Sequence, residues 1–181
     1  MLLLLIKGPE NSSSLQLSTE TSLTVFRTII QPHFDYCASL LYLLNSGCVA
    51  SLQKLLNRAM RIVLKCSRYT PIRIMIDVLG LLNVRERLFY FAMIFIFKIL
   101  QGCAPSYFSR FIVFQRQVHN YLTRHGSDFY VRRTKYRGTM NSPFHRSLIV
   151  FNGLPVVVRS AASLAEFKRR LLGYIHDSRG R

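Results

Sequence analysis

The stretch VASLQKLLNRAMRIVLK, residues 49–65, decides the fold class of this chain. Its apolar residues recur every three or four positions, which is the period of one face of an α-helix. The residues that share this face are Leu52, Leu55, Leu56, Ala59 and Val63. We therefore predict a helix over 49–65 that buries one side in a helical core.

The other side of this predicted helix is basic and carries no acid. Its basic residues step by four, three, four and three positions, so at about 100° per residue they fall within a sector of roughly 80°. We call this row the basic stripe, and it consists of Lys54, Arg58, Arg61, Lys65 and Arg68. Because solvated helix faces usually mix both signs of charge, an acid-free face favours contact with nucleic-acid phosphates. Two other interpretations stay open: a plain solvent-exposed face, and a contact with an acidic part of a larger parent protein.

Helices are also predicted on both sides of this stretch. Upstream, the apolar residues over 19–44 indicate a helix that is interrupted or kinked near Pro32, because proline removes a backbone donor. Downstream, Thr70 can cap a short helix that has Pro71 at its first position and ends near Gly80.

The remaining helices follow in the second half of the chain. A long helix over 84–101 is apolar on nearly every side between 88 and 97, which places it in the middle of the core. Ser142 starts a short helix, and Ser163 with Glu166 forms a capping box that opens the last one. We therefore expect a mainly α fold.

The expected architecture is an irregular helical bundle with a small β or loop-rich insertion around residues 106–140. We divide the chain into a loose leader over 1–18, a helical region over 19–105, and a basic aromatic segment with C-terminal helices packed on it over 106–181. The length of 181 residues suits one helical domain, or one domain with a smaller appended lobe.

Aromatic and basic residues alternate in the segment from 106 to 146. Arginine holds phosphates and aromatic rings stack on unpaired bases, so this interleaving is typical of grooves that bind single-stranded nucleic acid. Short strands that point aromatics inward and arginines outward would produce the same alternation, and that alternative stays open. The second basic surface predicted here consists of Arg124, Arg132, Arg133 and Arg137.

The overall charge favours a polyanionic partner and speaks against catalysis. The chain has 25 Lys and Arg against 8 Asp and Glu, a net charge of +17, and phosphate contacts would release counterions from nucleic acid. The acids lie singly along the sequence, whereas two-metal phosphoryl transfer needs clustered carboxylates. We therefore expect no catalytic residue, no metal and no other cofactor in this chain.

The spacing of the cysteines indicates the redox compartment of the chain, and the length of its apolar runs indicates whether a segment can span a membrane. The 4 Cys fit no close-paired zinc spacing and no secreted disulfide framework, which favours buried apolar thiols in a reducing, intracellular compartment, nuclear or cytoplasmic. The longest apolar run, over 88–97, suits a buried helix and is too short for a membrane span. We therefore expect no membrane partner.

Five stretches in order carry a family resemblance: FRTIIQPHFDYC over 26–37, LQKLLNRAMRIVL over 52–64, YTPIRIMIDVLGLLNVRER over 69–87, FKILQGCAPSYF over 97–108 and FNGLPVVVRSAASLAEFKRRL over 151–171. Together they resemble the C-terminal thumb and post-catalytic region of the reverse transcriptases of jockey-like non-LTR (LINE-type) retrotransposons. One position departs from the family, because Phe151 stands where the family usually has tryptophan.

This resemblance implies a fragment of an RNA-directed DNA polymerase that lacks the catalytic palm, and with it the Mg²⁺ of the parent enzyme. The region over 19–105 would then be thumb-like. The implied residual role is sequence-independent binding of a template–primer, with RNA or an RNA/DNA duplex as partner, the basic stripe as one contact surface and the second basic surface as another. The alternative is a structural module that packs on an upstream polymerase core and has no activity of its own.

Overall fold

The computed structural model describes residues 17–42, 45–118, 126–131, 135–136 and 142–179. It is mainly helical, and the expected fold class, an irregular helical bundle, is confirmed. The chain forms two compact units. The first contains Met1–Tyr36 and Leu44–Arg87, and the second contains Cys37–Leu43 and Leu88–Arg181.

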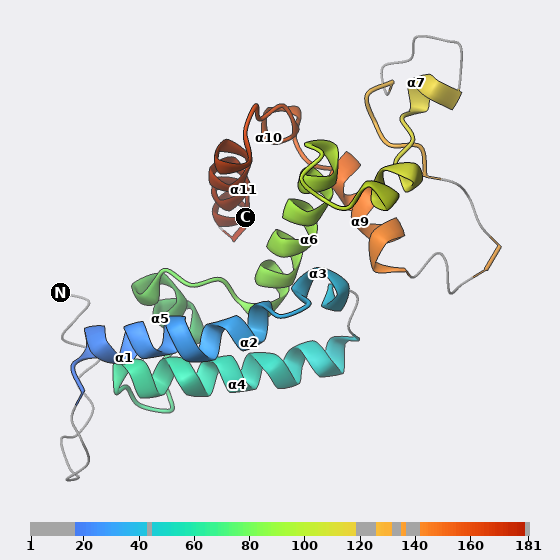
Figure 1. The fold of residues 1–181 in the computed structure, drawn as a ribbon. Coiled ribbons are helices and arrows are strands. Elements are labelled where there is room, and N and C mark those ends of the chain that lie inside the picture. The colour runs from blue at the N-terminus through green and yellow to red at the C-terminus, as the bar shows by residue number, and fades with distance from the viewer. Residues whose placement is uncertain (1–16, 43–44, 119–125, 132–134, 137–141, 180–181) are drawn as a thin grey trace. The chain divides into compact units, whose positions relative to one another are not determined.

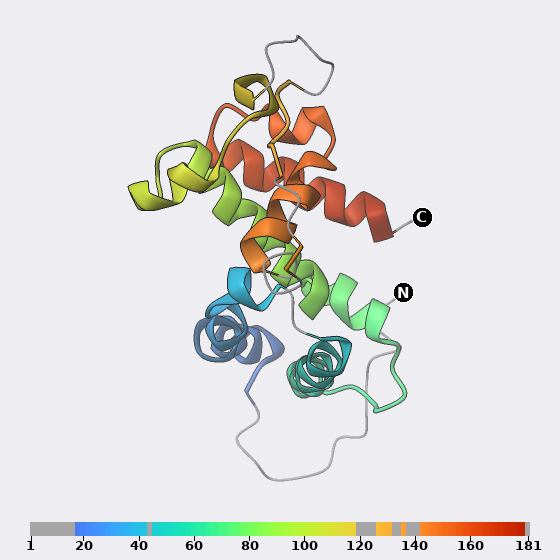
Figure 2. The same ribbon diagram turned by 90° about the vertical axis from the view of Figure 1, so that its right-hand side faces the viewer.

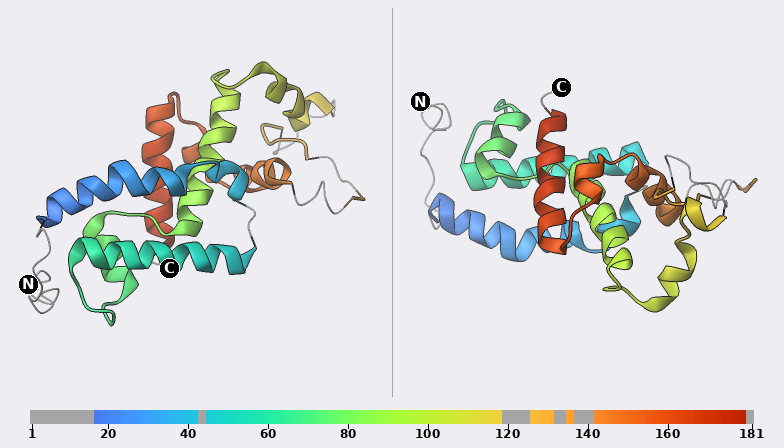
Figure 3. Two further views of the ribbon diagram at one scale, coloured as in Figure 1. Left: turned by 60° about the horizontal axis from the view of Figure 1, so that its bottom comes forward. Right: turned by 90° about the horizontal axis from the view of Figure 1, so that it is seen from above.

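The first unit is built on two long helical segments that lie side by side (Figures 1 and 3). One runs through α1 (Thr19–Val25), the π-helical η2 (Phe26–Ile30) and α2 (Gln31–Asp35). The other is α4 (Ser46–Leu64), which packs against α1 and against α5 (Ile72–Leu79). The buried side chains of this unit form its core: Phe26, Leu56, Met60, Val63, Leu64, Met75, Ile76, Leu79, Leu81, Leu82 and Val84.

The interruption expected near Pro32 takes the form of a π-helical turn. The backbone N–H of Gln31 donates to the carbonyl of Phe26, five residues back, and Pro32 then falls in the first turn of α2. A proline is tolerated there because the first turn of a helix leaves its N–H groups without intrahelical partners. The helical direction therefore continues through the proline and ends at Tyr36.

The ends of α4 and α5 differ in part from the predicted ones. Helix α4 begins three residues before the predicted start, where the Asn45 side chain accepts the N–H of Cys48 at 2.8 Å. The prediction that Thr70 caps the next helix is wrong, because α5 begins at Ile72 with Pro71 in the cap position and no side-chain cap. Gly80 ends α5 with φ +61°, the left-handed conformation that glycine adopts most easily.

The second unit surrounds most of α6 (Val84–Leu100), whose buried face includes Leu88, Ala92, Met93, Ile96 and Phe97. Its other elements are α3 (Ala38–Leu41), the 3-10 helix η3 (Ser106–Phe111), α7 (Gln115–Val118), α9 (Pro143–Asn152), α10 (Val156–Arg159) and α11 (Leu164–Arg179). Figure 2 shows α11 crossing α6. The expected position of the long apolar helix in a core is confirmed.

A row of phenylalanine rings runs through this second core. The rings of Phe97 and Phe167 stack with centroids 4.2 Å apart, and Phe167 lies 6.0 Å from Phe151. Phe151 in turn lies 5.3 Å from Phe129, and Phe129 lies 5.4 Å from Phe114. Such aromatic contacts add about 0.5–1.5 kcal/mol each beyond the burial of area. The row ties α6, α9 and α11 to the segment around Phe129.

The insertion around 106–140 is loop-rich in the part that the structure describes. It contains η3, α7 and one isolated antiparallel bridge between Phe114 and Phe129. Two hydrogen bonds make the bridge, in which the Tyr130 and Gln115 N–H groups donate to the carbonyls of Val113 and Asp128. Beyond it, the Arg116 N–H donates to the Gly126 carbonyl. Within the described residues of this segment, no longer strand forms.

Candidate nucleic-acid interface

Helix α4 presents three separate faces, and the first of them is the buried one. Leu56, Met60 and Val63 lie on it and pack into the core of the first unit. Leu55 was expected on the same face but is 58% exposed. The single apolar face predicted from the spacing is therefore split into a buried part and an open part.

The second face is the basic stripe, and the structure keeps three of its five residues on the helix. Lys54 and Arg58 are exposed, and Arg61 is half-buried with its Nε atom buried and unbonded. At about 100° per residue these three fall within roughly 60° of each other. They form one cationic row along α4.

The other two residues of the stripe lie beyond the end of the helix, which is a correction. Helix α4 ends at Leu64, and Lys65 adopts the left-handed conformation with φ 49° and ψ 39°. Arg68 lies in the turn that follows and holds its guanidinium 5.2 Å from the ring centroid of Tyr69. The helical spacing therefore does not fix where Lys65 and Arg68 point, although both are exposed.

The stripe is electrostatically uncompensated. In the part of the chain that the structure describes, none of its five cations forms an ion pair. Three carboxylates pair with other arginines instead: Asp35 with Arg87, Asp128 with Arg159 at 2.5 Å and Glu166 with Arg170 at 2.6 Å. These three arginines have structural roles, whereas the stripe leaves its positive charge facing solvent.

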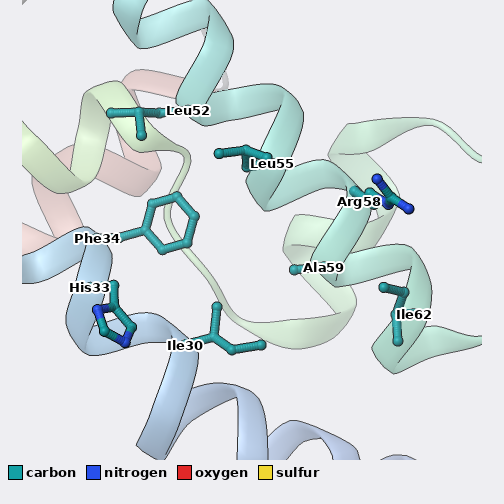
Figure 4. Close-up of a pocket in the computed structure, with 8 residues that line it drawn as sticks. All are labelled: Ile30, His33, Phe34, Leu52, Leu55, Arg58, Ala59 and Ile62. Carbon is teal, nitrogen blue, oxygen red and sulfur yellow. The ribbon is translucent and has the colours of Figure 1, made fainter.

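The third face of α4 lines an apolar groove of about 390 Å³ within the first unit (Figure 4). Leu52, Leu55, Ala59 and Ile62 line it from α4, and Arg58 lies beside them. Ile30, His33 and Phe34 line it from the end of η2 and from α2. Sequence periodicity missed this groove, because Leu52 and Ala59 were assigned to the core face.

The predicted second basic surface, Arg124, Arg132, Arg133 and Arg137, lies outside the described residues. The described part of the aromatic-basic segment divides into two kinds of aromatic. Phe114 and Phe129 belong to the core row of rings. Tyr107 and Phe111, by contrast, are 54% and 63% exposed and flank the exposed Arg110. The alternation therefore serves the core in one part and leaves rings at the surface in another.

The described residues include free thiols but no cluster of metal-binding side chains. Among them, no three His, Cys, Asp or Glu side chains gather closely enough to hold a metal ion. The four cysteines are free thiols, but the prediction that they are buried is wrong: Cys37, Cys48 and Cys103 are exposed, and Cys66 is half-buried. A search of the same residues for a helix with the length and hydropathy to cross a membrane found none.

Comparisons with protein-family models, with curated proteins and with solved structures found no match to this chain. The resemblance to retrotransposon reverse transcriptases therefore stays a prediction that rests on the five ordered stretches. The site itself is defined by its geometry: a row of unpaired cations on α4, with an open apolar groove on the adjacent face.

Proposed function

We propose that this chain binds the sugar–phosphate backbone of RNA or of an RNA/DNA duplex without reading its sequence. The observation that carries the proposal is the absence of any ion pair along the basic stripe in the described structure, while carboxylates elsewhere neutralise Arg87, Arg159 and Arg170. A cationic row on a rigid helix attracts phosphates because each contact releases condensed counterions. Phosphate contacts of this kind position a protein on nucleic acid but carry no sequence information.

We also propose that the chain is a fragment of a retrotransposon-type RNA-directed DNA polymerase that lacks the catalytic palm. The five ordered stretches support this origin. The Mg²⁺ of such a parent enzyme does not fit the residues that the structure describes, because no three metal-binding side chains gather among them and Asp35, Asp128 and Glu166 are each bonded to an arginine. We therefore assign no reaction and no metal-dependent step to this chain.

The second candidate function is a structural module that packs on a larger protein. The observation that favours it is the open apolar groove beside the stripe, because exposed apolar surface of this kind often marks a contact with another protein. In this alternative the stripe contributes solubility, or meets an acidic surface of the partner.

Salt-dependent binding of labelled RNA distinguishes the two candidates. We compare the full chain with a Lys54→Gln and Arg58→Gln double variant, since both side chains are exposed and their removal leaves the core intact. If each cation neutralises one phosphate, the slope of log K against log salt falls by roughly 0.7–0.9 per residue. The matched control is Lys168→Gln with Arg169→Gln on α11, which removes the same charge from another exposed helix face.

The proposal requires that the slope of log K against log salt fall more in the stripe variant than in the control variant. Equal losses would mean that the net charge of the molecule, and not the stripe, governs the binding. Failure of the unaltered chain to bind RNA at low salt would overturn the proposal and favour the packing module.

A further inference from the structure

The groove on the third face of α4 has the spacing of a helix-docking seam. Its α4 residues are Leu52, Leu55, Ala59 and Ile62, separated by three, four and three positions. This is the spacing with which one helix presents a continuous seam to another helix. From Leu52 to Ile62 the seam rises by ten steps of about 1.5 Å, or about 15 Å, which matches about three turns of a partner helix.

The seam is additional to the packing that α4 already makes. Leu56, Met60 and Val63 are buried on the core face, whereas Leu55 and Ile62 remain 58% and 68% exposed. Across the groove, Ile30 is also exposed, and the Phe34 ring points toward Leu52 and Leu55 (Figure 4). A trough between two neighbouring helices, with an apolar floor and exposed apolar rims, has the shape that accepts an amphipathic helix.

The charge around the groove selects the kind of helix. The polar residues that line it are Arg58 and His33, and none of the lining residues is acidic. Lys54 and Arg61 continue the cationic row on the same side of α4 as Arg58. An occupant with carboxylates along one edge of its apolar face would therefore meet unpaired cations, and charge complementarity of this kind sets orientation and excludes wrong partners.

A second copy of the chain fits this groove poorly. Each copy carries a net charge of +17, so a pair of copies joined along this face would bring two uncompensated stripes together. Nucleic acid also fits it poorly, because the apolar lining offers few donors for phosphate oxygens. A protein segment of opposite charge is the occupant that the chemistry favours.

We propose that the groove binds an amphipathic helix of a partner protein, with the apolar face of that helix between α2 and α4 and an aspartate or glutamate against Arg58. This interaction goes beyond the proposed nucleic-acid binding, because it uses the apolar face of α4 and shares only Arg58 with the basic stripe. It also predicts that changes to the apolar lining, Leu55→Asn or Ile62→Asn, leave RNA binding in place.

The probe is a synthetic helical peptide of about 18 residues with leucine at heptad spacing and glutamate at the flanking positions. Fluorescence anisotropy measures its affinity for the full chain. Three comparisons are made: a peptide with lysine in place of glutamate, a peptide of identical composition in scrambled order, and the protein variants Leu55→Asn and Ile62→Asn. The matched control variant is Val78→Asn, which changes an exposed apolar residue of α5 outside the groove.

We expect the glutamate peptide to bind at least about tenfold more tightly than the lysine peptide and the scrambled peptide. Leu55→Asn and Ile62→Asn should each weaken binding by about tenfold or more, and Val78→Asn should leave it unchanged. Circular dichroism of each variant confirms that it keeps its helices. Equal binding of the ordered and scrambled peptides would overturn the proposal, because general charge attraction would then explain the affinity. A chain that is dimeric by sedimentation and becomes monomeric in Leu55→Asn would also overturn it, since the occupant would be a second copy.

Discussion

The side-chain amide of Asn152 forms two hydrogen bonds with the backbone of Phe129, which lies 23 residues earlier in the chain. Its oxygen accepts the Phe129 N–H at 2.9 Å, and its nitrogen donates to the Phe129 carbonyl at 3.0 Å. Phe129 is only 2% exposed, so water has little access to these backbone groups. The last residue of α9 thus replaces the neighbouring strand that Phe129 lacks on that side.

Replacing Asn152 by alanine should destabilise the fold by about 1–3 kcal/mol, because a buried N–H and a buried carbonyl then lose their partners. The stability of Asn152→Asp should fall between that of the unaltered chain and that of Asn152→Ala, since a carboxylate still accepts the Phe129 N–H but cannot donate to the Phe129 carbonyl. Urea unfolding at equilibrium measures both. Ser127→Ala, an exposed change two residues from Phe129, serves as control. A free energy of unfolding that is unaltered in Asn152→Ala would mean that the paired bonds do not hold this segment.

The sequence predicted the elements of this fold better than the faces of its helices. Gly80, Ser142 and the Ser163 and Glu166 pair end or begin helices as expected, because their short-range chemistry acts within a few residues. Leu55 could not be assigned correctly, because α4 carries two adjacent apolar seams and only the neighbouring helices decide which one is buried. The partnership of Asn152 with Phe129 is likewise invisible to periodicity, since it joins segments far apart in sequence.

Part of the candidate site was predictable and part was not. The acid-free row of Lys54, Arg58 and Arg61 could be read from helical spacing. Lys65 and Arg68 were placed on the same helix wrongly, because nothing in their side chains signals the left-handed turn at Lys65. The groove needed the structure, since Ile30 ends a π-helical turn and Phe34 lies in the helix that follows it, and the proline alone does not specify the geometry of that turn.

The chain has a lysine at position 65, where the left-handed backbone would be more stable with glycine. Substitutions at this position test whether the positive charge of Lys65 contributes to binding at the expense of stability. A residue with a Cβ loses roughly 1–2 kcal/mol in the left-handed conformation that Lys65 adopts at the end of α4. Lys65→Gly should therefore stabilise the chain by about 1 kcal/mol, while Lys65→Ala removes the same charge without relieving the backbone. Thermal unfolding should separate the two variants, and the salt slope of RNA binding should fall equally in both. If Lys65→Ala stabilises the chain as much as Lys65→Gly does, the gain comes from the loss of charge repulsion and not from the backbone.

The exposed rings of η3 should contribute to binding only when bases are unpaired. Tyr107→Leu with Phe111→Leu keeps apolar contacts to the neighbouring rings but removes the aromatic faces, and each lost stacked base costs about 1–3 kcal/mol. Binding is compared between a single-stranded oligonucleotide and one in which abasic sites replace the bases. The unaltered chain should prefer the strand with bases, and the double variant should lose that preference while keeping its salt dependence. If the double variant still prefers the strand with bases, the bases stack on other residues. If the unaltered chain binds both strands equally, phosphate contact is the sole interaction.

Glu166 should make the C-terminal helix sensitive to acid. Its carboxylate accepts the N–H of Ala162 at 2.9 Å and pairs with Arg170, and these contacts lower the pKa of Glu166 below its ordinary value of 4.5, with the Ala162 N–H as the main cause. Because the folded chain holds this carboxylate in its charged form, the contribution to stability is present above the unfolded pKa and is lost as the pH falls through the folded pKa. The unfolding free energies of the chain and of Glu166→Gln should therefore differ at neutral pH and converge as the pH falls below the folded pKa of Glu166. Glu20→Gln, in the first turn of α1, removes a carboxylate of the first unit and should leave the acid-dependent loss in place. A difference in unfolding free energy between the chain and Glu166→Gln that stays constant across this range would mean that the carboxylate does not cap α11. The cap would then be the Ser163 hydroxyl alone, which accepts the Glu166 N–H at 3.2 Å.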